Sequence, residues 1–203
     1  MPNAVWAVVV ARVANGAKSR LAPVLSPSQR RSLALSMLSD VVRVSSHVLD
    51  GVVAVVDDPS ARDEALSYGA IVVDDPHPGD MNAAVQLGIS VATAHDVHTV
   101  IVLPADIPLI SASDLEALLE AAGEAQRAVV VGASRDGDGT NALLLRPPDV
   151  ITPAFGPPSV NRHVRAGIAA HAMTRVVRNL HLALDVDTPA DLAALAQSAG
   201  RAG

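Results

Sequence analysis

The sequence predicts an α/β fold: one domain built as a three-layer sandwich, with helices on both faces of a mostly parallel sheet. Short apolar runs alternate with longer segments of helical character along the whole chain of 203 residues. Half of these residues are hydrophobic, yet Trp, Tyr and Phe occur only once each, so Val, Leu, Ile and Ala must form the core. That composition is typical of parallel strands that helices cover. No internal repeat or Gly/Ser-rich linker divides the chain, so residues 1–203 are expected to form a single domain.

The first half of the chain is expected to contribute four strands. Each is an apolar run that stops at a polar or turn residue, which predicts burial on both faces of the sheet. The runs are Val5 to Ala11, Val52 to Val56, Ala70 to Val73 and Val100 to Leu103. Ser26, Pro27 and Gln29 form a capping-box pattern that opens a helix reaching about Val48. Two shorter helices are expected, from Ala61 to Ser67 and from Asp80 to Ala94.

The second half is expected to include an antiparallel pair of strands. A flexible acidic turn, Arg135 to Gly139, separates the runs Ala128 to Gly132 and Thr140 to Leu145, which favours such pairing. The last strands are expected at Val176 to Val177 and at Leu182 to Leu184. Helices are expected from Ser111 to about Ala122, from Val160 to Ala170, and after a cap formed by Thr188 to Asp191.

Composition argues against several classes of function. Cysteine is absent, so neither a disulfide framework nor a thiolate site can form. The seven histidines show no paired ligand spacing, which argues against zinc. The net charge of −6 argues against binding nucleic acid or an anionic membrane. No apolar run reaches the roughly 18 residues of a membrane span. A cytoplasmic protein is expected; its oligomeric state, a homodimer included, is left open.

Asp106 is the first candidate for a functional side chain. It lies just past the carboxyl end of the central apolar run, between Pro104 and Pro108. Open α/β sheets bind ligands beyond the carboxyl ends of their strands, so a carboxylate at this place is well positioned to bind a metal ion. The alternative is that Asp106 only terminates its strand.

A basic loop follows the first expected strand and carries Arg12, Lys18 and Arg20 around an Asn-Gly pair. Backbone N–H groups and cations in such a loop can surround triphosphate oxygens. The glycine and lysine spacing of a P-loop is missing. Lys18 is also the single lysine beside fourteen arginines. The alternative is a solvated surface loop.

Two further groups of polar residues, and Asn82, are candidates for binding a ligand. Asp185 and Asp187 would project from one face if the backbone there is extended, and two carboxylates directed at one point need a cation between them. Ser159 could cap a helix whose first turns carry Arg162, His163 and Arg165, and such a helix start is a natural phosphate site. Asn82 either reads a base, holds a phosphate or caps its own helix.

Five segments, taken in order, resemble a known family. They are Ala17-Lys18-Ser19-Arg20-Leu21-Ala22-Pro23, Leu103-Pro104-Ala105-Asp106-Ile107-Pro108, Gly137-Asp138-Gly139-Thr140-Asn141-Ala142-Leu143, Phe155-Gly156-Pro157-Pro158-Ser159 with Arg162-His163, and Leu184-Asp185-Val186-Asp187-Thr188-Pro189. The set is similar to the 2-phospho-L-lactate/phosphoenolpyruvate guanylyltransferases of deazaflavin coenzyme F-420 biosynthesis. These belong with nucleotidyltransferases similar to the molybdenum-cofactor guanylyltransferase, which have a nucleotide-diphospho-sugar transferase (GT-A-like) architecture.

The resemblance implies a reaction and a set of site residues. GTP and a small phosphorylated carboxylic acid would be joined with release of pyrophosphate. Asp106, Asp185 and Asp187 would hold Mg²⁺, and the phospho-acid would lie against Thr140, Gly156 and Ser159. Lys18, Arg20, Arg12 and Asn82 would contact the nucleotide, with Lys18 and Asp106 as the catalytic groups.

Two alternatives stay open at this point. One is another Mg²⁺-dependent nucleotidyltransferase with 3-phosphoglycerate, a sugar phosphate or molybdopterin as acceptor; the other is a non-catalytic nucleotide-binding regulator. Three converging carboxylates argue against a module that only binds. Phosphoenolpyruvate is the preferred acceptor, because the Ala- and Arg-rich composition resembles that of a GC-rich bacterium, and bacterial members of the family are associated with this acid.

Overall fold

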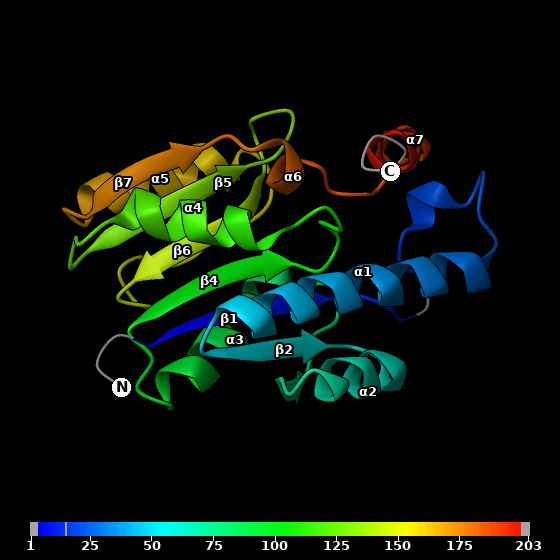
Figure 1. The fold of residues 1–203 in the computed structure, drawn as a ribbon, viewed down its shortest axis with the longest axis horizontal. Helices are drawn as coiled ribbons and strands as arrows, with labels where there is room; N and C mark the ends of the chain where they lie inside the picture. The colour runs from blue at the N-terminus through cyan, green and yellow to red at the C-terminus, as the bar shows by residue number, and fades with distance from the viewer. Residues whose placement is uncertain (1–3, 15, 200–203) are drawn as a thin grey trace.

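The computed structural model describes residues 4–14 and 16–199. They form one seven-stranded sheet in the order β3-β2-β1-β4-β6-β5-β7 (Figure 1). The strands are β1 (Val5–Ala11), β2 (Gly51–Val56), β3 (Ile71–Asp74), β4 (Thr99–Pro104), β5 (Ala128–Ala133), β6 (Thr140–Arg146) and β7 (Met173–Val177). Only β6 runs antiparallel to its neighbours, so the expected mostly parallel sheet and the β5–β6 pair are confirmed.

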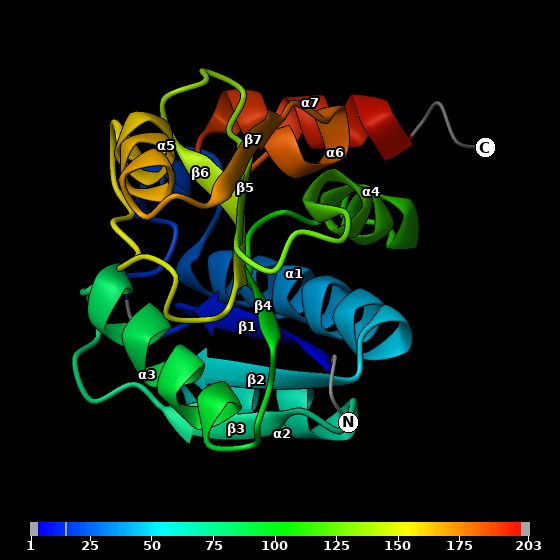
Figure 2. The same cartoon turned by 90° about the vertical axis from the view of Figure 1, so that its left-hand side faces the viewer.

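Helices cover both faces of this sheet, as Figure 2 shows with α3 and α5 on the side opposite to α1 and α4. The helices are α1 (Pro27–Val48), α2 (Pro59–Ser67), α3 (Met81–Thr93), α4 (Ala112–Ala122), α5 (Ser159–Ala169), α6 (Leu180–Ala183) and α7 (Pro189–Ala199), with a 3₁₀ turn at Ser19–Leu21. The predicted three-layer sandwich is therefore confirmed.

The core lies on both faces of the central strands, because side chains alternate along an extended chain. In β1, Val9 packs into the layer of α1, α2 and α4, whereas Val8 and Val10 pack into the layer of α3 and α5. Burying each such side chain contributes about 1.5–3 kcal/mol. Helix α3 approaches the sheet closely at Gly88, where an added Cβ would lie 2.3 Å from a methyl group of Val8.

Local signals set several of the helix starts. The capping box of α1 is present: Gln29 N–H donates to Ser26 Oγ, and Ser26 N–H donates to the Gln29 side chain. Helix α3 is capped by Asp80, whose carboxylate accepts from the N–H groups of Asn82 and Ala83. Asn82 therefore does not fill the capping role that the sequence left open for it.

Two sequence expectations about local structure are wrong. Leu182 to Leu184 is not a strand: Asn179 Oδ1 accepts from the N–H groups of His181 and Leu182 and starts the short helix α6. Ser159 does not cap α5 with its side chain, because Pro158 occupies the cap position and the Ser159 hydroxyl turns inward to Thr140.

The topology determines where a site can form. Parallel strands β1 and β4 end at one edge of the sheet, and antiparallel β6 begins at that same edge with Thr140. The loop after β1, the segment after β4 and the start of β6 therefore meet. Within the parts of the chain that the structure describes, no helix combines the length and apolar character needed to cross a membrane.

Candidate active site

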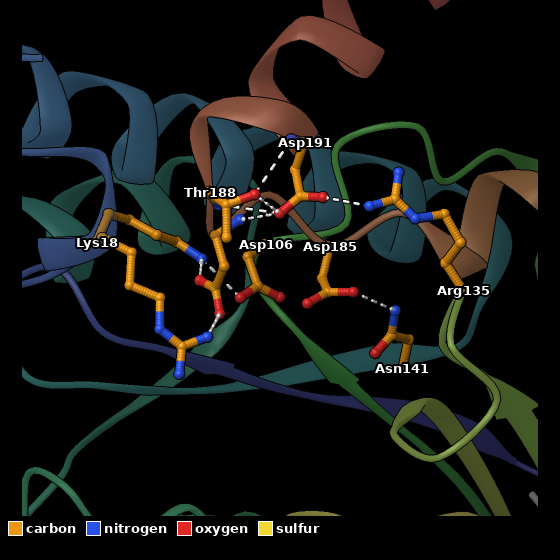
Figure 3. A network of polar contacts seen from close by, with 9 residues as sticks. Lys18, Asp106, Arg135, Asn141, Asp185, Thr188 and Asp191 are labelled. Atoms are coloured by element: carbon orange, nitrogen blue, oxygen red, sulfur yellow. Dashed lines mark hydrogen bonds and ion pairs between the residues drawn. The ribbon is translucent and has the colours of Figure 1, made fainter. Parts of the chain in front are cut away.

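Lys18 lies between two carboxylates at the carboxyl edge of the sheet. Its Nζ donates to Asp106 Oδ2 at 2.7 Å and to Asp187 Oδ1 at 2.8 Å, and its side chain is 8% exposed (Figure 3). Burial lowers the pKa of Lys18, but Asp106 and Asp187 outweigh it, so the pKa is raised above its usual value. The lysine therefore stays charged and joins the loop after β1 to segments more than 80 residues away, since the contact with Asp106 spans 88 positions.

The segment that carries Asp185 and Asp187 is fixed to the end of β4. Val186 N–H donates to the backbone carbonyl of Asp106 at 3.0 Å. Leu184 and Val186 are buried, whereas Asp185 and Asp187 are half-buried. The expected alternation is therefore present, although these residues pair with no strand in the described sheet.

Asp185 lies opposite Asp106, as Figure 3 shows, and accepts from Asn141 Nδ2 at 3.1 Å. Burial raises the pKa of Asp185, and the negative charges of Asp106 and Asp187 add to this rise. The donor from Asn141 only partly offsets them. The negative charges of Asp106 and Asp187 therefore act on Asp185, and the three carboxylates lie close enough to influence one another.

The donor set fits Mg²⁺ in its chemistry. Oδ1 of Asp106 is buried and has no hydrogen-bond partner among the described residues, which leaves a carboxylate oxygen available as a ligand. Mg²⁺ prefers such hard oxygen ligands. Within residues 4–14 and 16–199, no group of three or more acidic or histidine side chains stands in metal-binding geometry. Asp106 and Asp187 instead turn toward Lys18.

A first cavity of about 360 Å³ opens beside this cluster. We call it the nucleotide cavity, because Arg12 and Lys18, two of the residues that the resemblance assigns to the nucleotide, line it. Arg12 and Lys18 bring positive charge, whereas Ala34, Met37 and Met81 form an apolar wall. Asp106 and Asp187 also line this cavity, so it reaches the aspartate cluster.

A second cavity of about 510 Å³ lies on the other side, and Asp187 borders both. We call it the acceptor cavity. Thr140, Gly156 and Ser159, the three residues that the resemblance assigned to the phospho-acid, all line it. Asp185 lines it as well, so this cavity also reaches the carboxylates.

Two residues that the resemblance assigned to the nucleotide are absent from the described lining of the nucleotide cavity. Arg20 lines the acceptor cavity, with its guanidinium 3.9 Å from Asp187 Oδ2. Asn82 is absent from the described lining of both cavities, and its amide is bonded to Phe155: Oδ1 accepts from the backbone N–H at 2.7 Å, and Nδ2 donates to the carbonyl at 3.3 Å. Asn82 thus fixes the loop before α5 to the start of α3.

Sequence reasoning did not single out Arg135 or Asn141. Arg135 lines the acceptor cavity and is held by Asp191, 2.6 Å away. Asn141 positions Asp185 and also donates to the carbonyl of Leu182 at 3.0 Å. The position of Asn141 beside Thr140 at the start of β6 is the signal that could have found it.

Known proteins match this chain over almost its whole length. The family model described as guanylyl transferase CofC like covers residues 6–198. A phosphoenolpyruvate guanylyltransferase from Rubrobacter xylanophilus is 41% identical over 197 residues, which are 97% of this chain and 95% of that protein. The enzyme of that name from Sphaerobacter thermophilus is 39% identical over 192 residues, with 94% and 91% covered.

An archaeal relative carries a different name. The 2-phospho-L-lactate guanylyltransferase from Methanothermobacter thermautotrophicus is 35% identical over 176 residues, which are 87% of this chain and 77% of that protein. Among solved structures, a nucleotide-diphospho-sugar transferase from Desulfovibrio desulfuricans has a TM-score of 0.77 at 15% identity and covers 97% of this chain and 87% of its own. It confirms the predicted architecture. The family match and the identities over most of the chain show that this protein belongs to the family of CofC-like guanylyl transferases.

Proposed function

We propose that this protein transfers the guanylyl group of GTP to a small phosphorylated carboxylic acid and releases pyrophosphate, as a step of coenzyme F-420 biosynthesis. One observation carries the proposal: two cavities of different chemistry meet at Asp187, on either side of Lys18 and the aspartates. A transferase needs such an arrangement, because donor and acceptor must bind side by side with their reacting phosphates in contact.

The nucleotide cavity suits a nucleoside triphosphate. Its apolar wall of Ala34, Met37 and Met81 offers packing for a flat base. Arg12 and Lys18 offer positive charge to the phosphates. Charge-assisted hydrogen bonds of this kind are about twice as strong as neutral ones, which suits a polyanionic ligand.

The acceptor cavity suits an acid that carries both a carboxylate and a phosphate. The hydroxyl of Thr140 and the side chains of Arg20 and Arg135 present donors to it. Gly156, in the left-handed region with φ +94°, lies in a loop that lines the cavity. Asp191 holds Arg135, so its guanidinium is positioned before any ligand arrives.

The reaction needs little acid–base chemistry from the protein. An ionised phosphate oxygen of the acceptor attacks the α-phosphorus of GTP, a new P–O bond forms, and the bond to the β-phosphate bridging oxygen breaks as pyrophosphate leaves. Catalysis is then positioning and neutralisation of charge. Lys18 places a fixed cation beside Asp187, where the two cavities meet. Mg²⁺, held by Asp106, Asp185 and Asp187, would add positive charge at the phosphate oxygens.

Phosphoenolpyruvate is the acceptor that we propose. Two relatives at 39% and 41% identity carry its name, against 35% for a relative named for 2-phospho-L-lactate. The two acids differ by a planar methylene carbon against a tetrahedral carbon with a methyl group. A difference of that size is worth about 1–3 kcal/mol, so we expect preference and not exclusion.

The test is pyrophosphate release by the purified protein with Mg²⁺, each of the four nucleoside triphosphates and a panel of three acids: phosphoenolpyruvate, 2-phospho-L-lactate and 3-phosphoglycerate. We expect the highest kcat/KM for GTP with phosphoenolpyruvate, and mass spectrometry should find the guanylyl-pyrophosphoryl product. A higher kcat/KM with another acid would refute the acceptor while leaving guanylyl transfer intact. Binding of GTP without pyrophosphate release in any combination would favour a regulator instead. The cytoplasmic location and the homodimer stay predictions.

A further inference from the structure

The hydroxyl groups of Thr140 and Ser159 and the imidazole of His163 form a buried hydrogen-bonded cluster at the acceptor cavity. His163 and Ser159 are 0% exposed, and Thr140 is 7% exposed. Thr140 Oγ1 lies 3.1 Å from His163 Nδ1 and 2.9 Å from Ser159 Oγ. Thr140 and Ser159 line the cavity, whereas His163 lies behind them on α5.

The hydrogen bonds determine which ring nitrogen of His163 carries the proton. Ala154 N–H donates to His163 Nε2 at 2.9 Å. A backbone N–H can only donate, so Nε2 is unprotonated. A neutral imidazole then carries its single proton on Nδ1, which makes His163 the donor to Thr140. Burial, with a smaller contribution from the charge of Arg162, lowers the pKa of His163 to about 4, so the ring is neutral near pH 7.

The ring is also held in place from its side. Phe155 meets His163 edge to face, with the ring centroids 5.2 Å apart and the planes at 69°. Asn82 fixes the backbone of Phe155 on both its N–H and its carbonyl. His163 is therefore positioned by contacts that do not involve Thr140, so it can impose an orientation on the threonine hydroxyl.

The hydrogen bonds of Thr140 Oγ1 also determine where its own proton can go. A hydroxyl has one proton and two acceptor lone pairs. His163 Nδ1–H and Ser159 Oγ–H both donate to Oγ1 and occupy the two lone pairs. Among the described residues, none accepts a hydrogen bond from Thr140 Oγ1. The hydroxyl proton is thus left for a group in the acceptor cavity.

We propose that His163 is a positioning residue for the acceptor: together with Ser159 it fixes the Thr140 hydroxyl as a hydrogen-bond donor to a carboxylate or phosphate oxygen of the bound acid. This rests on the proposed function for the identity of the ligand, but not for the arrangement of the donors. A threonine free to rotate would present a lone pair to an anion for part of the time. His163 and Ser159 remove that option.

Two substitutions at one position separate positioning from general support of the fold. In His163→Asn the amide nitrogen can reach the place of Nδ1, so the donor to Thr140 is kept and the acceptor for Ala154 N–H is lost. In His163→Gln the amide reaches the place of Nε2, so the acceptor is kept and the donor is lost. We expect His163→Gln to raise KM for phosphoenolpyruvate about tenfold, and His163→Asn to stay within about threefold of the parent. KM for GTP should not change in either variant.

A double-mutant cycle checks that His163 acts through Thr140. In a Thr140→Val background, His163→Gln should not raise the KM for the acid further, because the hydroxyl that it orients is gone. Thr140→Ser, which keeps the hydroxyl, is the matched control. Additive effects, equal losses in His163→Gln and His163→Asn, or a parallel rise in KM for GTP would overturn the proposal.

NMR of the protein labelled with ¹⁵N-histidine tests the arrangement without any turnover. We expect His163 in the neutral Nδ1–H form at pH 7, with its signals shifted on addition of phosphoenolpyruvate. An Nε2–H tautomer or an imidazolium would overturn the proposal even in an active enzyme. The expected tautomer in a protein that transfers no guanylyl group would contradict the proposed function instead.

Discussion

Replacing Lys18 by Met removes the one cation that the described structure places between Asp106 and Asp187. The side chain of Lys18 is 8% exposed, whereas those of Asp106 and Asp187 are 27% and 39% exposed. Removing one partner of a fully buried pair typically destabilises a protein by about 3–5 kcal/mol, and an exposed pair contributes about 0.2–1 kcal/mol. Since these carboxylates are only partly buried, we expect a loss of about 1–3 kcal/mol.

The contribution of Lys18 to the free energy of unfolding is complete at neutral pH. The pKa of Lys18 is raised in the folded state, so its contribution is fully present below the pKa of an unfolded lysine and is lost only as the pH rises through the folded value. For a chain of this length, each kcal/mol changes the melting temperature by about 2–4 °C. Lys18→Met should therefore lower it by about 2–12 °C at pH 7 without divalent metal.

The matched control is Arg20→Met, which removes the same charge from the same loop. Arg20 is 74% exposed and lies 3.9 Å from Asp187, so we expect its loss to lower the melting temperature by less than about 2 °C.

Thermal unfolding with and without MgCl₂ completes the test of Lys18. If the aspartates bind the metal, Lys18→Met frees two of them, and the increase caused by MgCl₂ should be larger in this variant than in the parent protein. Equal melting temperatures for the two variants, or equal responses to MgCl₂ in Lys18→Met and the parent, would refute this account of the cluster.

Asp185→Asn keeps an acceptor for Asn141 but removes a carboxylate whose pKa is raised by burial and by two neighbouring aspartates. Above the usual carboxyl pKa the substitution should therefore increase the melting temperature, while turnover falls by about 10²-fold or more. A lower melting temperature in differential scanning fluorimetry would contradict this. Arg20→Ala should raise KM for the acid more than KM for GTP, and Arg12→Ala should do the reverse, because the two arginines line different cavities; steady-state kinetics with each substrate varied decides between them. Folding lowers the pKa of His163 from 6.5 to about 4, so the neutral ring contributes fully to the free energy of unfolding above pH 6.5. About 3 kcal/mol of that free energy is lost as the pH falls to 4, because the unfolded chain then binds a proton that the folded protein binds weakly. Urea unfolding of the parent and of His163→Asn at pH 7 and pH 4.5 measures the difference.

Much of the fold could be predicted because the signals are local. The apolar runs of β1, β2 and β4 are long enough to be buried on both faces, and the capping box at Ser26 marks the start of α1 within one residue. The prediction of a strand at Leu182 to Leu184 was wrong, because three apolar residues fit a strand and a helix equally well. The side chain of Asn179, bonded to the buried Asp114 of α4, decides in favour of a helix, and that contact spans 65 positions.

The roles of Asn82 and Arg20 show where sequence reasoning about the site ends. Each is a polar residue in a segment near the site, and a sequence places it no more finely than that. The side chain of Asn82 accepts a hydrogen bond from the backbone N–H of Phe155, 73 positions away. Arg20 follows Lys18 by two residues, but the 3₁₀ turn at Ser19–Leu21 brings it to the acceptor cavity. Which cavity a loop cation reaches depends on turn geometry that composition does not encode.

Asp185 and Asp187 were predicted to share a face if the backbone there is extended. The strand predicted just before them, Leu182 to Leu184, is not part of the described sheet, yet the two carboxylates do lie together. The reason is that alternation needs only an extended backbone with one side buried, and not a partner strand. Leu184 and Val186 provide the buried side, and a single bond from Val186 N–H to the carbonyl of Asp106 fixes the register. That one bond also sets which aspartates stand opposite Asp106. A one-residue shift would turn Val186 toward the site and bury the two carboxylates, so the segment between α6 and α7 should tolerate neither an insertion nor a deletion without loss of the aspartate cluster.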